Sequence, residues 1–256
     1  MTHRIFVSVS ALALCLACGA SPAELHMPAP PPASVLERGE PIYVGRVYPL
    51  GEAASAPTFE YERRVAGSGD DSLSTHVTRD PSGAVVLAES ARHTADYRLL
   101  DYRLYANQLG QSGSVHVDGD RLTFRRLDAS GEHVAEERVA EPVAVGPTLV
   151  GYIRQHLTEL RRGETVPVRL ALLDRLETLG FELSAVGAEP GQTRIEMQPA
   201  SALIALVVDP ILFTFQAQGD KLVRLEGRVP PKRPSGGGWD DFDARVEYRY
   251  LASEYR

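Results

Sequence analysis

The chain has 256 residues, with 27 Lys and Arg against 34 Asp and Glu, and its formal net charge at pH 7 is −7. This acidic balance argues against a nucleic-acid surface, which needs clustered Lys and Arg to neutralise phosphates. The two cysteines, Cys15 and Cys18, lie near the N-terminus, so a domain after them has neither a disulfide nor Cys-ligated zinc. Its stability must come from core burial, which a single β-rich domain of this length can supply.

The N-terminus predicts an export signal. His3 and Arg4 precede an apolar run over residues 5–17, which is too short to span a bilayer as a helix. We therefore expect residues 1–17 to be a signal peptide. No later run is apolar and long enough to cross a membrane, so we expect any membrane contact to depend on this end of the chain.

The residues around the expected cleavage site resemble a bacterial lipobox, in which the signal peptidase cuts before a cysteine that then carries the lipid. They read Leu16-Ala17-Cys18-Gly19, which implies a lipid attached to Cys18. The lipobox favours Leu where this chain has Cys15, so ordinary cleavage after Ala20 or Ala23 is the alternative. We expect an exported lipoprotein of the cell envelope, facing the periplasm.

The next segment predicts a tether. Residues 18–41 are rich in Pro and Ala and lack the regular apolar pattern of a core element. A Pro-rich linker of some twenty residues, extended at about 3.1 Å each, could hold a domain roughly 60 Å from the anchored cysteine. The alternative is a frayed N-terminus without a function. Residues 42–256 are expected to form one antiparallel β-rich domain.

Strand patterns follow at close spacing in the first half of this domain. Residues 58–66 show the alternation clearly, with Phe59, Tyr61, Arg63 and Val65 on one face, and a period of two is typical of a half-buried strand. Turn residues separate the segments, which predicts hairpins and an antiparallel meander. The predicted strands are 42–48, 58–66, 73–78, 84–91, 97–107, 115–117 and 122–127.

The pattern changes to helical at Gly146-Pro147. Leu149, Ile153 and Leu157 recur at helical spacing before Gly163 ends the segment, and Pro is favoured in the first turn of a helix. We predict one amphipathic helix over residues 147–162, lying across the concave face of the sheet.

Strands dominate again in the remaining chain. Residues 199–208 are apolar almost throughout, which predicts either a buried short helix or a central strand. Composition predicts a loop over residues 230–238. The predicted strands are 166–173, 181–186, 194–197, the hairpin 211–217 and 221–227, and a closing strand 242–251.

These elements predict a mainly β (α+β) fold, an incomplete or half β-barrel packed on one or two helices. Their order, with a Gly-Pro helix start, a Val208-Asp209-Pro210-Ile211 entry to a hairpin and a Tyr-rich final strand, resembles an uncharacterised family of exported bacterial proteins. That family is similar in architecture to the periplasmic lipoprotein carriers. The resemblance covers residues 41–250, brings no catalytic residues, and implies a concave apolar surface between sheet and helix, which accommodates acyl chains in the carriers.

No motif predicts catalysis. A Gly-x-Ser-x-Gly elbow, a P-loop and a dinucleotide fingerprint are absent from the sequence, and the histidines are dispersed. The acidic residues Asp240, Asp241 and Asp243 next to Trp239 do not match the spacing of an EF-hand loop, so we expect solvated acids instead of a metal site. We expect no catalytic residue, no cofactor and no metal.

The candidate ligand site is apolar. If a ligand exists, we expect it in the deepest part of the interior, lined by Ile153, Leu157, Leu203, Val207, Phe213 and Phe215. Plain core packing is the alternative for these residues, because a segment apolar on all sides meets either core or ligand. Tyr97, Tyr102 and Tyr105 could line a groove with Trp239, or they could be cross-strand pairs that stabilise the sheet.

Three functions remain open at this stage. The leading hypothesis is a non-enzymatic envelope lipoprotein that binds a lipid or another apolar or amphipathic ligand. The first alternative is an assembly module that holds a protein partner through outer strands and residues 230–238. The second is a hydrolase acting on envelope material.

Overall fold

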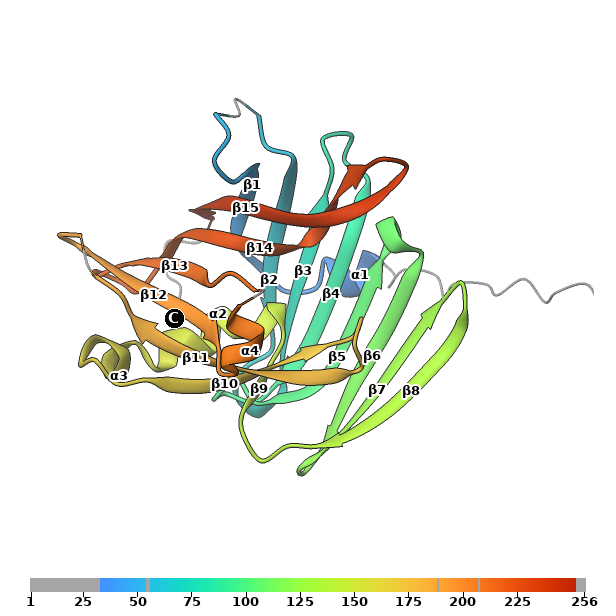
Figure 1. Cartoon of the computed structure of the whole chain (residues 1–256), viewed down its shortest axis with the longest axis horizontal. Coiled ribbons are helices and arrows are strands. Elements are labelled where there is room, and N and C mark those ends of the chain that lie inside the picture. The colour runs from blue at the N-terminus through green and yellow to red at the C-terminus, as the bar shows by residue number, and fades with distance from the viewer. Residues whose placement is uncertain (1–32, 54–55, 188, 207, 252–256) are drawn as a thin grey trace, which may run out of the picture.

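The computed structural model describes residues 33–53, 56–187, 189–206 and 208–251, and strands dominate this part of the chain (Figure 1). The helices are α1 Ala33–Leu36, α2 Gly146–Gln155, α3 Leu157–Arg161 and α4 Ala202–Ala205. The strands are β1 Glu40–Pro49, β2 Phe59–Ala66, β3 Ser72–Arg79, β4 Val85–His93, β5 Leu99–Ala106, β6 Gln111–Asp118, β7 Arg121–Asp128, β8 Gly131–Arg138, β9 Val143–Ala144, β10 Val166–Leu172, β11 Glu177–Ala185, β12 Gln192–Pro199, β13 Ile211–Gln216, β14 Leu222–Ser235 and β15 Gly238–Tyr250.

All these strands belong to one sheet, in the order β8-β7-β6-β5-β4-β3-β2-β1-β15-β14-β13-β12-β11-β10-β9. Two antiparallel meanders, β1 to β8 and β10 to β15, are joined where β1 pairs with β15. The predicted meander is therefore confirmed. Strands β8 and β9 end the described ladder and do not pair with each other, so the sheet is open and barrel-like.

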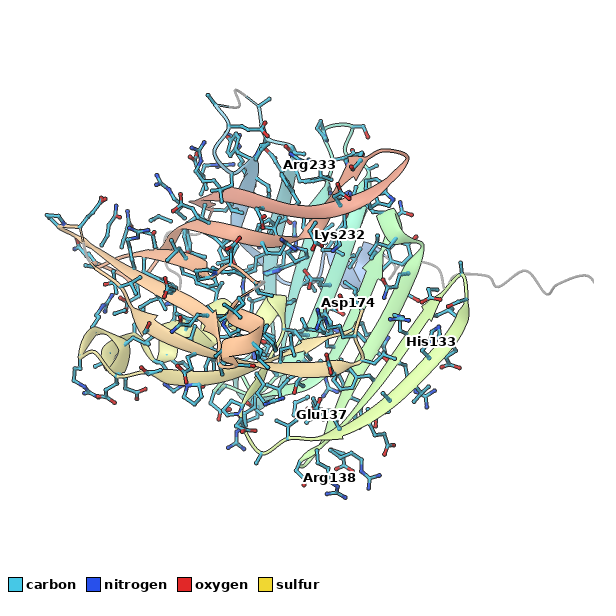
Figure 2. All side chains as sticks on the ribbon, viewed as in Figure 1. His133, Glu137, Arg138, Asp174, Lys232 and Arg233 are labelled. Atoms are coloured by element: carbon cyan, nitrogen blue, oxygen red, sulfur yellow. The ribbon has the colours of Figure 1, made fainter. Side chains whose placement is uncertain are left out.

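Side chains connect the two halves of the open sheet where the backbone ladder does not. Glu137 of β8 accepts hydrogen bonds from the backbone N–H of Thr178 at 2.7 Å and from its hydroxyl at 2.8 Å. The side-chain amide of Gln108 pairs with both backbone groups of Lys232, at 3.0 and 2.9 Å. Figure 2 labels Glu137 of β8 in its lower part and Lys232 of β14 above it. These bonds stabilise the curled shape.

The open sheet curls around an interior, which we call the inside of the curl. Side chains and α2 fill this space. Ile153 of α2 and Leu157 of α3 pack in one cluster with Phe213 and Phe215, and all four side chains are at most 1% exposed. A second cluster joins Tyr102, Val115 and Phe124 of the other meander. Such burial is the main source of stability for a chain without a disulfide in its fold.

The helical segment differs from the prediction in one respect. The single helix predicted over 147–162 is wrong, because His156 has φ −97° and ψ 5° and separates α2 from α3. The N–H of His156 bonds to the carbonyl of Ile153, three residues earlier. A three-residue bond tightens the last turn of a helix, which lets the chain change direction there.

The loop predicted over 230–238 is also wrong. Residues of this segment extend β14 and β15 into a long hairpin that turns at Gly236 and Gly237, with φ 54° and 89°. Glycine adopts such positive φ values without strain, as tight hairpin turns require. The register shifts between Val229 and Arg233, where two prolines supply no N–H for the ladder.

The strands β8 and β5 also differ from the sequence pattern. Strand β8 was not predicted, since its exposed residues include Val134 at 52% and its sequence shows no apolar face. Strand β5 begins at Leu99 and not at Tyr97, which lies before it with φ 58°.

The last residues of the predicted tether belong to the fold. Within residues 18–41, the part described by the structure contains α1 and the start of β1. Leu36 is 7% exposed and packs against Val77 and Ala88, while the hydroxyl of Thr75 donates to its carbonyl oxygen. The expectation of no core element is therefore corrected for this part, and residues 18–32 lie outside the described residues. Within the described chain, no helix has the length and apolar character needed to cross a membrane.

Within the apolar segment 199–208, residues Ala202–Ala205 form one turn of helix, α4, on the surface. Leu203 and Leu206 are 79% and 81% exposed, so the prediction that this corner is buried is wrong for them. The turn connects the antiparallel strands β12 and β13, and a connection of this kind runs over the outside of a sheet.

Leu157 and Leu203 offer a direct test of this packing. We expect Leu157→Ala to lower the free energy of unfolding by roughly 2–5 kcal/mol, because it leaves a cavity in the core. Leu203→Ala should change it by no more than about 0.5 kcal/mol, as is usual for surface positions. Chemical denaturation of both variants measures the difference, and equal losses would contradict the described positions.

Candidate functional site

The six predicted ligand residues do not form one site. Four of them, Ile153, Leu157, Phe213 and Phe215, are brought together in the packed core around α2. Leu203 points into solvent, and Val207 lies outside the described residues. The prediction of a shared lining is therefore corrected for Leu203, and the four buried residues contact one another.

The aromatic residues proposed for a groove are also dispersed. Tyr102 is buried and faces the interior, whereas Tyr105, three residues later in β5, faces the opposite side of the sheet. Tyr97 stacks on His93, with ring centroids 4.9 Å apart and an interplanar angle of 15°. Trp239 lies near the tip of the β14–β15 hairpin, 44% exposed.

Two of the three acidic residues next to Trp239 form ion pairs with basic side chains of β14. Asp243 accepts a hydrogen bond from Arg228 at 2.7 Å, and Asp241 forms ion pairs with both Arg228 and Lys232. Asp241 and Asp243 therefore serve cross-strand pairing in this hairpin. No group of His, Cys, Asp and Glu that could hold a metal ion occurs among the described residues.

A cluster of buried polar groups lies inside the curl, at the start of α2. Arg63 of β2 is fully buried, and its guanidinium donates to the carbonyl oxygen of Pro147 and, at 3.2 Å, to the hydroxyl of Ser74. The ring of Tyr43 lies 5.9 Å from the guanidinium carbon, within the range of a cation–π contact. Arg63 thus connects strands β2 and β3 to the helix.

A relay of hydrogen bonds continues from Ser74. Its hydroxyl lies 2.9 Å from Nε2 of His93, and Nδ1 of His93 lies 2.8 Å from the carbonyl oxygen of Thr94. Since a carbonyl only accepts, Nδ1 carries the proton. Burial lowers the pKa of His93 and so favours the neutral imidazole, in which Nε2 accepts from the hydroxyl of Ser74. The Ser74–His93 pair is closed to solvent, since both residues are buried.

Glu89 is the buried acid of this cluster. Burial raises its pKa to about 7, although the hydroxyl of Tyr102, which donates to it at 2.7 Å, acts in the opposite direction. Nδ1 of His76 lies 3.9 Å from the carboxylate of Glu89. Burial is the main cause that lowers the pKa of the His76 imidazole, and the charge of Arg63 lowers it further. A Cβ at Gly146 would come within 2.9 Å of the carboxylate, so glycine lets α2 start against Glu89.

The polar cluster was not predicted as a site, although one signal for it was present. Arg63 interrupts the face formed by Phe59, Tyr61 and Val65, and a charged residue on a buried face needs partners. Sequence could not identify those partners, because Pro147 lies 84 residues away from Arg63. Chemically, the bonds of this cluster hold α2 against strands β2 to β4.

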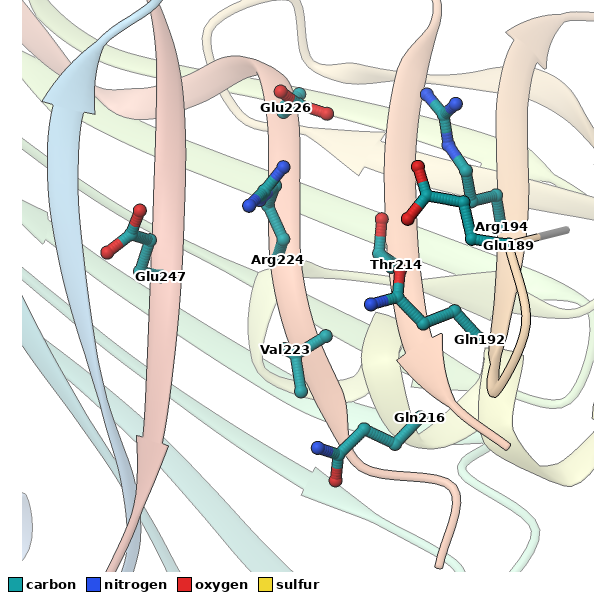
Figure 3. Close-up of a pocket in the computed structure, with 9 residues that line it drawn as sticks. All are labelled: Glu189, Gln192, Arg194, Thr214, Gln216, Val223, Arg224, Glu226 and Glu247. Atoms are coloured by element: carbon teal, nitrogen blue, oxygen red, sulfur yellow. The ribbon is translucent and has the colours of Figure 1, made fainter. Parts of the chain in front are cut away.

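Two hollows lie on the outer face of the sheet, the face turned away from Tyr102 and Val115. One, of about 640 Å³, is polar and crosses β12 to β15, with Arg194, Arg224 and Glu247 among its residues (Figure 3). We call the other, of about 840 Å³, the α1 groove. It crosses the outer face from β3 to β8, and the residues used below are Val35, Leu73, Arg103, Tyr105, Arg125 and Leu127.

Glu89 predicts a specific pH dependence of stability. Its folded pKa lies above the unfolded value of about 4.3, so the folded state binds the proton more tightly and loses stability as pH rises from about 4.3 through about 7. We expect Glu89→Gln, which keeps an acceptor for Tyr102, to gain up to about 3 kcal/mol relative to the wild type between those limits.

Denaturation of both proteins across this pH range measures the effect. His76 and His93 have lowered pKa values, so each makes stability rise with pH below about 6.5. Both proteins retain these histidines, and the comparison therefore isolates the carboxyl group. Parallel stability curves for the two proteins would contradict the buried position of Glu89.

Comparisons with known proteins identify no family. No family model matches the chain, and no curated protein matches it. Among solved structures, the chain is similar to the crystal structure of a beta-barrel-like protein of the domain of unknown function DUF1849 from Brucella abortus. The sequences are 10% identical, the TM-score is 0.48, and the match covers 83% of this chain and 97% of that chain.

Proposed function

We propose that this chain is a non-enzymatic lipoprotein of the bacterial cell envelope that binds an amphipathic ligand. The export signal and Cys18 supply the location in this proposal. The barrel-like sheet supplies a rigid scaffold. The sequence predicts a ligand site inside the curl, whereas we place the site on the outer face of the sheet.

The observation that carries the proposal is the contrast between the two faces. Inside, Ile153 and Phe215 are fully buried among other apolar side chains, and α2 occupies the concave side. Outside, the α1 groove combines apolar residues such as Leu73 and Leu127 with basic residues such as Arg103. Ligand sites characteristically combine an apolar lining with a few polar groups, in volumes of about 300–1,000 Å³.

An assembly module remains the second candidate, because one surface feature favours it. Leu203 and Leu206 of the α4 turn are exposed large apolar side chains, and exposed apolar patches mark contacts with partners or membranes. A hydrolase is the third candidate and has less support. The Ser74–His93 pair is buried, and Arg63 donates to the serine oxygen that would have to act as nucleophile.

Extraction of the acylated protein under native conditions, followed by lipid mass spectrometry, tests the function. We expect an amphipathic lipid in addition to the anchor itself. A well-folded protein free of such a lipid would contradict the proposal. Cross-linking in intact cells tests the second candidate at the same time, since a reproducible stoichiometric protein partner would favour the assembly module.

The membrane attachment has its own test. We expect a high-salt wash to release Cys18→Ser, but not the wild-type protein, from the membrane fraction, because acylation of this residue would be lost. Fractionation of cells followed by immunoblotting measures the shift. If the variant stays with membranes after a high-salt wash, the anchor does not depend on Cys18.

A further inference from the structure

A row of hydroxyl and guanidinium groups crosses the α1 groove. The strand registers place Ser90 opposite Arg103, Arg103 opposite Ser114, and Ser114 opposite Arg125. Arg103 and Arg125 therefore lie two strands apart with Ser114 between them, and their backbones are about 10 Å from each other. Long arginine side chains at this separation can converge on one anion, and guanidinium groups bind phosphate oxygens in bidentate geometry.

The groups in this row have unused hydrogen-bonding capacity. Among the described residues, the side chain of Arg103 takes part in no ion pair or hydrogen bond, whereas that of neighbouring Arg92 is paired with both Asp71 and Asp101. Arg125 contacts Glu132 at 3.1 Å, but both side chains are more than half exposed, and such pairs are weak. The chain is acidic overall, so this basic row differs from its average surface.

Apolar residues lie next to the basic row. Tyr105 and Leu127 flank Ser112 in the row on one side of it, and Val35 of α1 lines the groove as well. Leu73 lies in the row on the other side, opposite Arg92. From β3 to β8 the groove crosses five strand spacings, about 24 Å. A ligand that contacts both regions must carry an anion and an extended apolar part.

We propose that the α1 groove binds an anionic phospholipid, with the headgroup phosphate at Arg103 and Arg125 and an acyl chain along Val35, Tyr105 and Leu127. This inference rests on the proposed function and specifies its ligand. The phosphate accepts hydrogen bonds from the guanidinium groups and from the hydroxyl of Ser114. The acyl chain covers the apolar wall, where its transfer from water is favourable.

The position of α1 agrees with a membrane ligand. Val35 belongs to the first described element, and only fourteen residues separate Cys18 from Ala33. A chain of that length spans at most about 50 Å when fully extended. If Cys18 carries a lipid, the groove therefore stays within reach of the membrane surface.

Binding to vesicles tests the proposal in the unacylated Cys18→Ser form of the full exported chain. Phosphatidylcholine vesicles with and without phosphatidylglycerol are the probes, and co-sedimentation is the measurement. We expect binding that requires phosphatidylglycerol and that falls roughly fivefold or more in Arg103→Gln, the effect of one basic residue at an anionic surface. Arg224→Gln is the matched control, because Arg224 is also exposed on the outer face but lines the polar hollow. It should bind like the parent.

The remaining outcomes separate the possible ligands. Leu127→Ser should weaken vesicle binding, and inorganic phosphate alone should not displace the vesicles. Equal losses in Arg103→Gln and Arg224→Gln would show that general surface charge causes the binding and would overturn the proposal. Displacement by phosphate with no effect of Leu127→Ser would overturn it too. If the acylated protein carries a neutral lipid that Arg103→Gln does not remove, the proposed function survives and this inference fails.

Discussion

The fold depends on one buried contact, the donation from the guanidinium of Arg63 to the carbonyl oxygen of Pro147. A fully buried arginine is costly unless its hydrogen bonds are satisfied, and here Ser74 and the ring of Tyr43 supply further partners. The contact places the start of α2 against β2 to β4. From that point the helix carries Ile153 into the cluster formed by the second meander, so one side chain couples both halves of an open sheet.

This coupling determines where the molecule can bind other molecules. An open sheet of this kind could enclose a ligand on its concave side, but α2 occupies that space, and Glu89 and His76 are buried with it. The side-chain bonds from Glu137 to Thr178 and from Gln108 to Lys232 hold the halves together around the helix. The outer face, in contrast, carries basic and apolar groups that the fold itself does not use, which supports a ligand site there.

The sequence predicts the class of fold well, because strand alternation and turn residues are local signals. It also identifies the helix start at Gly146-Pro147, but not the break at His156, which depends on a hydrogen bond to Ile153. Strand β8 has no apolar face to detect, and the apolar turn around Leu203 is exposed although its composition suggests burial. The candidate site depends on strand registers such as Arg103 with Ser114, which arise only when distant segments pair.

Hydrogen–deuterium exchange of α2 tests the central claim most directly. If Arg63 and the core hold the helix inside the curl, the amides of residues 149–153 exchange only through global unfolding, as slowly as those of β3 and β4. Arg63→Met should then accelerate exchange in α2 more than in β13, because it removes the contact with Pro147. Fast exchange of α2 in the wild-type protein, with β3 and β4 still protected, would contradict the account, since the helix would then leave the interior without unfolding of the sheet.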